Sequence, residues 1–275
     1  MSRTGEGTVF DPKNWTLHQK LASGACLDAL WLSLGSVALC EIAARSQPAL
    51  LVIDIQHGLW DRATVEAAIA VAGSVAVMVR VADHSAYAIS SALDAGAQGI
   101  IVPLVETVEQ AQAAVAAARF PPHGARSGGG LRPTADFPAY VAAAKRGTVV
   151  SVMIETRAGL ANAHAIAGVP GLDMIFIGTG DLALSLGTFP DFGPEHERAC
   201  ADILEACRAH NVACGLYTGS MEAACAMRER GYRMVVTATD SDMAARSFAQ
   251  AREQFRQPAT KSKAKAPGRT AGAKS

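Results

Sequence analysis

Two carboxylates in this 275-residue sequence follow short apolar runs and have the side-chain chemistry to share a cation. Glu155 comes directly after the run Val149–Ile154, and Asp181 follows the run Met174–Ile177 after a short Gly-Thr-Gly turn. Two carboxylates with room for water and a substrate oxygen suit a hard divalent cation such as Mg²⁺ or Mn²⁺. The structural alternatives are a helix N-cap for Asp181 and, for Glu155, an ion pair with a nearby arginine.

An arginine and a histidine occupy similar positions after two other apolar runs. Arg80 ends the run 75–79, where a guanidinium must be paired or hydrated. It could face a substrate oxyanion such as an enolate, or it could form a structural salt bridge. His57 lies three residues after Asp54, which could orient the imidazole and raise its basicity for proton transfer. A buried, hydrogen-bonded histidine without a catalytic role is the alternative.

The lysines argue against one kind of carbonyl chemistry. A Schiff-base aldolase needs a buried lysine on a barrel strand. Outside the last 20 residues the sequence has only Lys13, Lys20 and Lys145, and none follows an apolar run in the way that Glu155 does. Activation of a carbonyl group would therefore have to come from a metal ion.

Eight β-then-α units predict how these residues are positioned. Nearly continuous apolar runs indicate parallel strands that are covered by helices on both faces. The repeat predicts a (β/α)8 TIM barrel, with the active site at the C-terminal ends of the strands. A doubly wound open sheet is the alternative, but no G-x-G-x-x-G follows the first strand. The predicted strands are Leu30–Leu34, Leu50–Asp54, Ser74–Arg80, Gly99–Val102, Val149–Ile154, Met174–Ile177, Ala213–Leu216 and Met234–Thr237. The predicted helices are Ser36–Ala44, Ala63–Val71, Ser85–Ala95, Val108–Ala118, Pro138–Lys145, Gly159–Ala165, Glu195–His210, Ser220–Arg230 and Ser241–Phe255.

Composition and charge exclude several classes of protein. The last 20 residues hold six of the 25 basic residues and no acidic one, which leaves 19 basic and 25 acidic residues in the rest, a formal charge of −6. An acidic body argues against nucleic-acid binding. No apolar run is long enough to span a membrane, and the first residues lack a signal-peptide core. Six cysteines without a Cys-x-x-Cys pair suggest reduced thiols and a cytoplasmic protein. We expect one catalytic barrel domain over residues 1–256 and a basic, disordered tail over residues 257–275.

An ordered set of motifs resembles the HpcH/HpaI family of class II pyruvate aldolases over about residues 30 to 255. The matching segments are LVIDIQHG (51–58), VR (79–80), LDAGAQ (93–98), VP (102–103), RFPPHG (119–124), IETR (154–157) and FIGTGDL (176–182). The resemblance implies a (β/α)8 barrel that uses a divalent metal (Mg²⁺, Mn²⁺ or Co²⁺) to make or break a bond between pyruvate, a 2-oxo acid, and an aldehyde. It also implies a homohexamer, often a trimer of dimers that exchange a C-terminal helix.

The resemblance also assigns roles to individual residues. It implies that Glu155 and Asp181 are metal ligands, that Arg80 steadies the pyruvate enolate, and that His57 is catalytic with Asp54 as its partner. The resemblance further implies that Asp94 reaches a neighbouring subunit's site and that the backbone of Gly180 and Asp181 holds the pyruvate carboxylate. The apolar surroundings indicate Leu216 as a residue that contacts the substrate.

Three departures from the family pattern affect the surroundings of the metal and histidine. Gln56 stands where the family usually has Glu, Met153 stands where it often has Gln, and Gly178-Thr-Gly-Asp181 replaces Gly-Pro-Ala-Asp.

Oxaloacetate decarboxylation or cleavage of a CoA ester on the same barrel are the enzymatic alternatives. A barrel that binds a 2-oxo acid without turnover is the non-enzymatic one.

Overall fold

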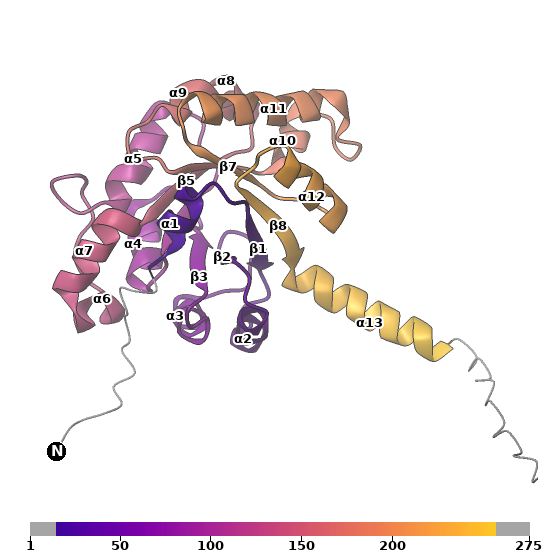
Figure 1. Ribbon diagram of the computed structural model, residues 1–275, viewed down its shortest axis with the longest axis horizontal. Coiled ribbons are helices and arrows are strands. Elements are labelled where there is room, and N and C mark those ends of the chain that lie inside the picture. Colours follow the sequence, from indigo (N-terminus) through magenta and orange to yellow (C-terminus); the bar gives the residue numbers. More distant parts are fainter. Residues whose placement is uncertain (1–14, 257–275) are drawn as a thin grey trace, which may run out of the picture.

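Eight parallel strands close into a barrel, as Figure 1 shows. The computed structural model describes residues 15–256, and within them each strand pairs with its neighbours in sequence while β1 pairs with β8. The TIM barrel predicted from the sequence is therefore confirmed. The strands are β1 (Leu27–Leu32), β2 (Leu50–Asp54), β3 (Ala76–Arg80), β4 (Gly99–Val102), β5 (Val149–Ile154), β6 (Met174–Ile177), β7 (Ala213–Leu216) and β8 (Met234–Thr239).

Helices connect successive strands and cover the outside of the barrel. The side chain of the residue just before several of these helices accepts a hydrogen bond from the first turn, so local sequence defines where they begin. Asp61 and Thr107 each form a capping box with the third residue of the helix that follows. The helices are α1 (Leu17–Ala22), α2 (Val37–Arg45), α3 (Arg62–Val71), α4 (Ala86–Asp94), α5 (Val108–Ala118), α6 (Leu131–Ala135), α7 (Phe137–Gly147), α8 (Arg157–Ala161), α9 (Ala163–Ala167), α10 (Thr179–Leu186), α11 (Gly193–Ala209), α12 (Met221–Glu229) and α13 (Asp240–Arg256).

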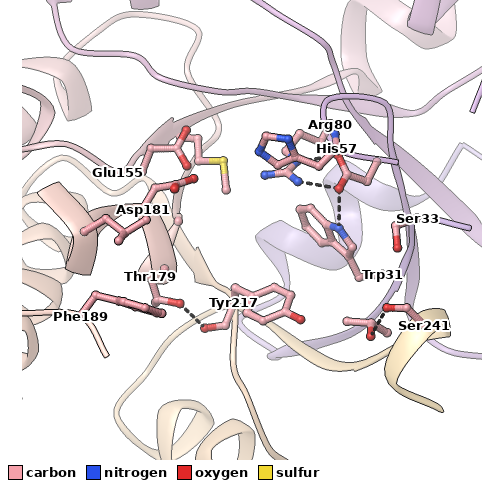
Figure 2. A pocket seen from close by; sticks show the side chains of 16 residues that line it. Trp31, Ser33, His57, Arg80, Glu155, Thr179, Asp181, Phe189, Tyr217 and Ser241 are labelled. Carbon is pink, nitrogen blue, oxygen red and sulfur yellow. Dashed lines mark hydrogen bonds and ion pairs between the residues drawn. The ribbon is translucent and has the colours of Figure 1, made fainter. Parts of the chain in front are cut away.

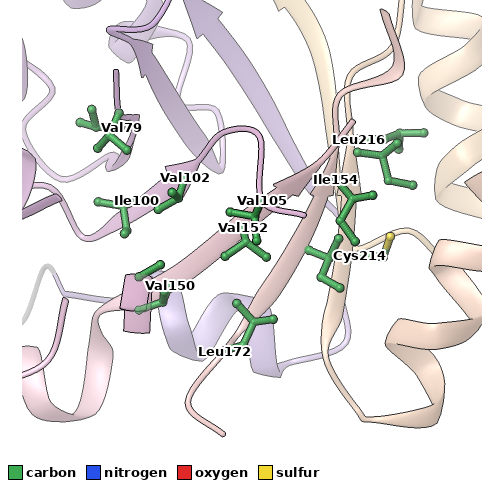
Figure 3. Packing of buried hydrophobic residues seen from close by; sticks show 14 of the residues in the cluster. Val79, Ile100, Val102, Val105, Val150, Val152, Ile154, Leu172, Cys214 and Leu216 are labelled. Carbon is green, nitrogen blue, oxygen red and sulfur yellow. The ribbon is translucent and has the colours of Figure 1, made fainter. Parts of the chain in front are cut away.

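The strands divide the core into two layers. Leu50 and Val52 belong to the cluster inside the barrel, whereas Leu51 and Ile53 belong to the cluster between the barrel and its helices. Figure 3 shows part of the outer cluster, including Val79 and residues of β4 and β5. Because successive side chains on a strand point to opposite faces, this alternation also decides which residues at the strand ends point into the barrel mouth.

The predicted elements differ from the structure mainly at polar or glycine-rich positions. β1 begins at Leu27, whereas the predicted strand begins at Leu30. The prediction started too late because the exposed Asp28 interrupts the apolar run. The helices α1, α6 and α10 were not predicted, and the segment predicted as one helix over 159–165 forms α8 and α9. α10 opens with Thr-Gly-Asp, a sequence more typical of a loop.

The last helix, α13, leaves the barrel instead of packing against it, as Figure 1 shows. None of its 17 residues is buried. Its exposed apolar side chains include Met243, Phe248 and Phe255. Within residues 15–256, no helix combines the length and the apolar character needed to cross a membrane. The predicted disordered tail, 257–275, and the first 14 residues of the predicted domain lie outside the described residues.

Candidate active site

A pocket of about 390 Å³ opens at the C-terminal ends of the strands, where the active site is predicted. Figure 2 shows Glu155 and Asp181 together at one side of it, with His57 and Arg80 beside them. These side chains come from four different strand ends. The pocket is lined by Trp31, Ser33, Asp54, His57, Arg80, Met153, Glu155, Gly178, Thr179, Gly180, Asp181, Leu184, Phe189, Tyr217, Thr239 and Ser241.

Asp54 and Arg80 form a buried, two-point ion pair between the ends of β2 and β3. Nε of Arg80 lies 2.8 Å from Oδ1 of Asp54, and Nη2 lies 2.5 Å from Oδ2. The indole of Trp31 donates to Oδ2 over 3.2 Å, and the Arg80 guanidinium lies 5.0 Å from the Trp31 ring centre. Burial alone would raise the pKa of Asp54, but the hydrogen bonds and charge of Arg80, with the bonds from His57 and Trp31, lower it. The structural salt bridge considered for Arg80 is therefore present.

His57 lies at the rim of the pocket with an exposed side chain. Its backbone N–H, rather than its ring, donates to Oδ1 of Asp54 over 3.3 Å. The expectation that Asp54 orients the imidazole therefore differs from the structure, because Arg80 and Trp31 take up the carboxylate oxygens. Because His57 follows Asp54 by only three residues, this backbone hydrogen bond instead stabilises the turn that carries the imidazole.

Glu155 is a buried carboxylate whose two oxygens have unequal surroundings. Oε1 accepts the backbone N–H of Leu104 over 2.8 Å, whereas Oε2 is buried and has no hydrogen-bond partner among residues 15–256. Burial raises the pKa of Glu155 to about 7, and the nearby charge of Asp181 contributes in the same direction. Arg157, one possible ion-pair partner, instead reaches Glu195 and backbone carbonyls near the end of α10.

Asp181 lies in the first turn of α10, within electrostatic reach of Glu155. It is not the N-cap of that helix, because Gly178 occupies the N-cap position. The structure thus brings the two predicted metal ligands together. A buried oxygen without a partner, next to a second carboxylate, fits the donor set of a hard divalent cation. Among residues 15–256 no group of three or more His, Cys, Asp or Glu could hold a metal, so the remaining ligand positions would fall to water and substrate.

Gly178 allows Glu155 to approach the start of α10. A Cβ atom built at Gly178 would collide with Oε2 of Glu155 and would lie 2.8 Å from its Cβ. A Cβ built at Gly180 meets no atom within 4 Å. The first glycine of the Gly-Thr-Gly-Asp segment is therefore required by the packing of the carboxylate, and the second leaves space on the pocket side.

Two of the predicted site residues lie elsewhere. Leu216 belongs to the outer hydrophobic cluster, and the next residue, Tyr217, lines the pocket instead. The alternation along β7 explains this correction, since Leu216 and Cys214 share the outer face. Asp94 ends α4, on the rim opposite the pocket, and pairs with Arg126 over 2.8 Å. It does not line the pocket of its own chain.

Several lining residues that carry no charge were not predicted from the sequence. Trp31, Ser33 and Tyr217 belong to or follow β1 and β7, and Thr239 and Ser241 lie at the junction of β8 with α13. Counting alternate residues along β7 would have placed Tyr217 in the mouth. The others depend on where β1 and β8 end, and those boundaries were predicted less well.

Comparison with known proteins agrees with the barrel fold and shows the family. A family described as HpcH/HpaI aldolase/citrate lyase matches residues 28–247. A 4-hydroxy-2-oxovalerate aldolase of Rhodococcus jostii is 36% identical over 251 residues, which cover 89% of this chain and 97% of that protein. A hydroxypyruvate/pyruvate aldolase of Paraburkholderia phytofirmans is 31% identical over 253 residues, covering 87% and 97% of the two chains. A crystal structure of an HpcH/HpaI aldolase/citrate lyase family protein from Burkholderia cenocepacia superposes with a TM-score of 0.83 at 32% identity, covering 88% of this chain and 99% of the other.

The named relatives show that the chain is an aldolase, which is a carbon–carbon lyase. More narrowly, the chain belongs to the HpcH/HpaI aldolase/citrate lyase family. Aldolases of this family generally depend on a divalent metal.

Proposed function

We propose that this protein is a metal-dependent pyruvate aldolase that cleaves or forms 4-hydroxy-2-oxo acids. The observation that carries the proposal is the partnerless Oε2 of Glu155, buried beside Asp181 in the same pocket as Arg80 and His57. The relatives named as aldolases of 4-hydroxy-2-oxovalerate and of hydroxypyruvate or pyruvate support this reaction class.

Glu155 and Asp181 would hold the divalent cation, which we expect to be Mg²⁺, Mn²⁺ or Co²⁺. When bound, such an ion acts as a Lewis acid toward the oxygens of a 2-oxo acid. The raised pKa of Glu155 reflects how poorly its negative charge is compensated by protein groups alone. A bound cation would supply that compensation.

Arg80 provides a fixed positive charge for the oxygen at C2 of the substrate. Asp54 engages Nε and Nη2 of the guanidinium, so Nη1 is left to donate to a substrate oxygen. As the bond between C3 and C4 breaks, its electron pair moves toward C2 and negative charge develops on that oxygen. A preorganised donor at this position is worth about 3–4 kcal/mol in the transition state.

His57 acts as the base that begins cleavage. Through a water molecule, its imidazole takes the proton of the C4 hydroxyl, and the C4 oxygen becomes the carbonyl oxygen of the departing aldehyde. The pyruvate enolate that remains is protonated at C3 to give pyruvate. The exposed position of His57 at the rim is compatible with proton exchange with solvent.

The start of α10 can hold the substrate carboxylate. Backbone N–H groups at a helix N-terminus favour anions, and Gly180 and Asp181 lie in the first turn of this eight-residue helix. The open space around Gly180 leaves room for that group.

We expect the enzyme to be a homohexamer in the cytoplasm. The projecting helix α13, with no buried residue and with exposed Phe248 and Phe255, supports assembly in which this helix packs on another subunit. In such an assembly Asp94 would reach a neighbouring subunit's site. The six free thiols support a reducing compartment.

The proposal is tested by following pyruvate release from 4-hydroxy-2-oxopentanoate. We expect turnover that EDTA abolishes and Mn²⁺ restores, and metal-dependent exchange of the pyruvate methyl protons by NMR. His57→Ala should reduce cleavage by about a hundredfold. The exposed His84 serves as a matched control, because it lies outside the pocket and His84→Ala should leave the rate unchanged. Turnover that persists after complete removal of metal would contradict the proposal.

A further inference from the structure

The pocket extends beyond the groups that would hold the reacting carbons. Glu155, Asp181 and Arg80 lie toward β3, β5 and β6, and Figure 2 shows Ser33 and Ser241 on the side away from the two carboxylates. A wall formed by β1, β7, β8 and the start of α13 closes that side. We call it the neutral wall, and its residues are Trp31, Ser33, Tyr217, Thr239 and Ser241. The part of the aldehyde beyond its carbonyl carbon has this side of the pocket to occupy.

Hydroxyl groups of the neutral wall bond to each other and to a carboxylate behind them. Oγ of Ser33 donates to Oδ1 of Asp240 over 3.2 Å, and Oγ1 of Thr239 lies 3.2 Å from Oγ of Ser241. Oγ1 of Thr239 also accepts the backbone N–H of Asp242 over 3.1 Å. The wall therefore presents polar but uncharged groups to the pocket.

Asp240 is held firmly behind this wall. Its carboxylate accepts the backbone N–H groups of Ser33, Leu34 and Ser241, each over 2.9 Å. Asp242 lies close by, since its negative charge adds to burial in raising the pKa of Tyr217. Asp240 and Asp242 thus place two negative charges behind the wall, and neither of them lines the pocket itself.

Among residues 15–256, Arg80 is the one arginine that lines the pocket, and no lysine lines it. Asp54 engages Nε and Nη2 of Arg80, and the substrate oxygen at C2 would take Nη1. His57 lies on the loop after β2, which meets Ser33 through the hydrogen bond from the Leu59 N–H to the Ser33 carbonyl. Arg246 of α13 acts on Tyr217 only as the weakest of the charges around it, and it does not line the pocket. A carboxylate or phosphate on the aldehyde would face like charge here, which costs binding energy.

We propose that the aldehyde partner of this enzyme is uncharged, and that the neutral wall with Asp240 behind it excludes aldehydes bearing a carboxylate or phosphate. This inference rests on the proposed aldolase function and specifies its second substrate. Ser241, at the edge of the wall and next to Asp240, is the residue from which that selectivity can be changed most directly.

The test compares two aldehydes of matched size in aldol addition to pyruvate. Succinic semialdehyde carries a carboxylate, and 4-methylpentanal replaces that group with an isopropyl group of similar shape. We expect kcat/KM to be at least about tenfold higher for 4-methylpentanal at low ionic strength, with the ratio shrinking as salt screens the repulsion. Equal or better use of succinic semialdehyde would overturn the inference.

A charge placed on the wall should reverse the preference. Ser241→Arg should raise kcat/KM for succinic semialdehyde relative to 4-methylpentanal by about tenfold. Ser247→Arg adds the same charge at an exposed position of α13 outside the pocket and should leave the ratio unchanged. Arg246→Ala should also leave it unchanged, and a loss of succinic semialdehyde turnover in that variant would assign Arg246 as an anion contact and contradict the inference.

Pyruvate methyl-proton exchange separates this inference from the proposed function. Exchange needs no aldehyde, so metal-dependent exchange together with a preference for the anionic aldehyde would overturn the inference alone. Failure of both exchange and aldol addition with either aldehyde would overturn the aldolase proposal, and the inference with it.

Discussion

Asp54 and Glu155 are carboxylates of the same pocket, buried to the same depth, yet their surroundings are opposite. Their exposed fractions are 2% and 1%. Asp54 is bonded to Arg80, Trp31 and the backbone of His57, and its pKa is lowered despite burial. Glu155 has one backbone donor and a partnerless oxygen, and burial raises its pKa to about 7.

The difference shows that burial alone does not define a functional carboxylate. On the β2–β3 side the negative charge is neutralised by an arginine from the same chain, which makes that side a rigid support. On the β5–β6 side the carboxyl group of Glu155 lies beside a second carboxylate, so a bound cation would stabilise its charged form, which burial disfavours. The comparison therefore distinguishes a built ion pair from a site that requires a ligand.

Removing the cation of the built pair should have the largest effect on stability. Arg80→Met leaves Asp54 buried without its main partner, and we expect the free energy of unfolding to fall by about 3 kcal/mol at pH 7. Urea denaturation measures this loss. Arg45→Met removes an exposed arginine that pairs with Glu41 and should cost less than about 0.5 kcal/mol.

The double variant Asp54→Asn/Arg80→Met sharpens the same prediction. It removes the unpaired charge as well, so part of the stability lost in Arg80→Met should return. A loss in Arg80→Met no larger than that in Arg45→Met would show that the pair is not a structural support.

Neutralising Glu155 should raise, rather than lower, the free energy of unfolding of the metal-free protein. The pKa of Glu155 is about 7 in the folded chain and roughly 4.3 in an unfolded one. Its contribution to stability is therefore fully present below the lower value and is lost as the pH rises through the higher one. In EDTA, the free energy of unfolding of Glu155→Gln, relative to that of the wild type, should rise between pH 4.5 and 7.5 by on the order of 2 kcal/mol.

Denaturation at several pH values, with and without Mn²⁺, measures that gain. Excess Mn²⁺ should stabilise the wild type and not the variant. Glu195→Gln, which neutralises an exposed carboxylate, should show no such dependence. A constant difference between wild type and Glu155→Gln across this pH range would break the comparison between the two sides of the pocket.

The glycines beside Asp181 should give the smallest effects. Gly178→Ala forces Glu155 to shift, and we expect a loss of about 1 kcal/mol in stability with weaker Mn²⁺ binding. Gly180→Ala enters open space in a helix and should be neutral or slightly stabilising. Thermal unfolding separates the two, and equal effects would mean that Gly178 is not needed for the position of Glu155.

The strand pattern predicted the barrel and the charged part of the pocket because both follow from local features. Glu155 and Arg80 stand out as charges at the ends of apolar runs, and barrel geometry brings such ends together. The sequence did not predict that Asp54 pairs with Arg80 rather than with His57. Both possible partners lie at strand ends near Asp54, and the sequence alone does not give the distances between their side chains.

The uncharged lining escaped prediction for a different physical reason. Ser33, Tyr217 and Ser241 have no charge that requires a partner, so their position in the pocket depends on side-chain alternation and on strand ends defined by tertiary contacts. Leu216 was placed in the pocket because apolar character alone does not tell the inner face of a strand from the outer one.

Mn²⁺ binding followed by electron paramagnetic resonance tests the central claim most directly. We expect one Mn²⁺ per chain in the wild type, about hundredfold weaker binding in Glu155→Gln and in Asp181→Asn, and nearly unchanged binding in Asp54→Asn. Wild-type affinity in both Glu155→Gln and Asp181→Asn would contradict the account, because Glu155 and Asp181 would then not share the ion.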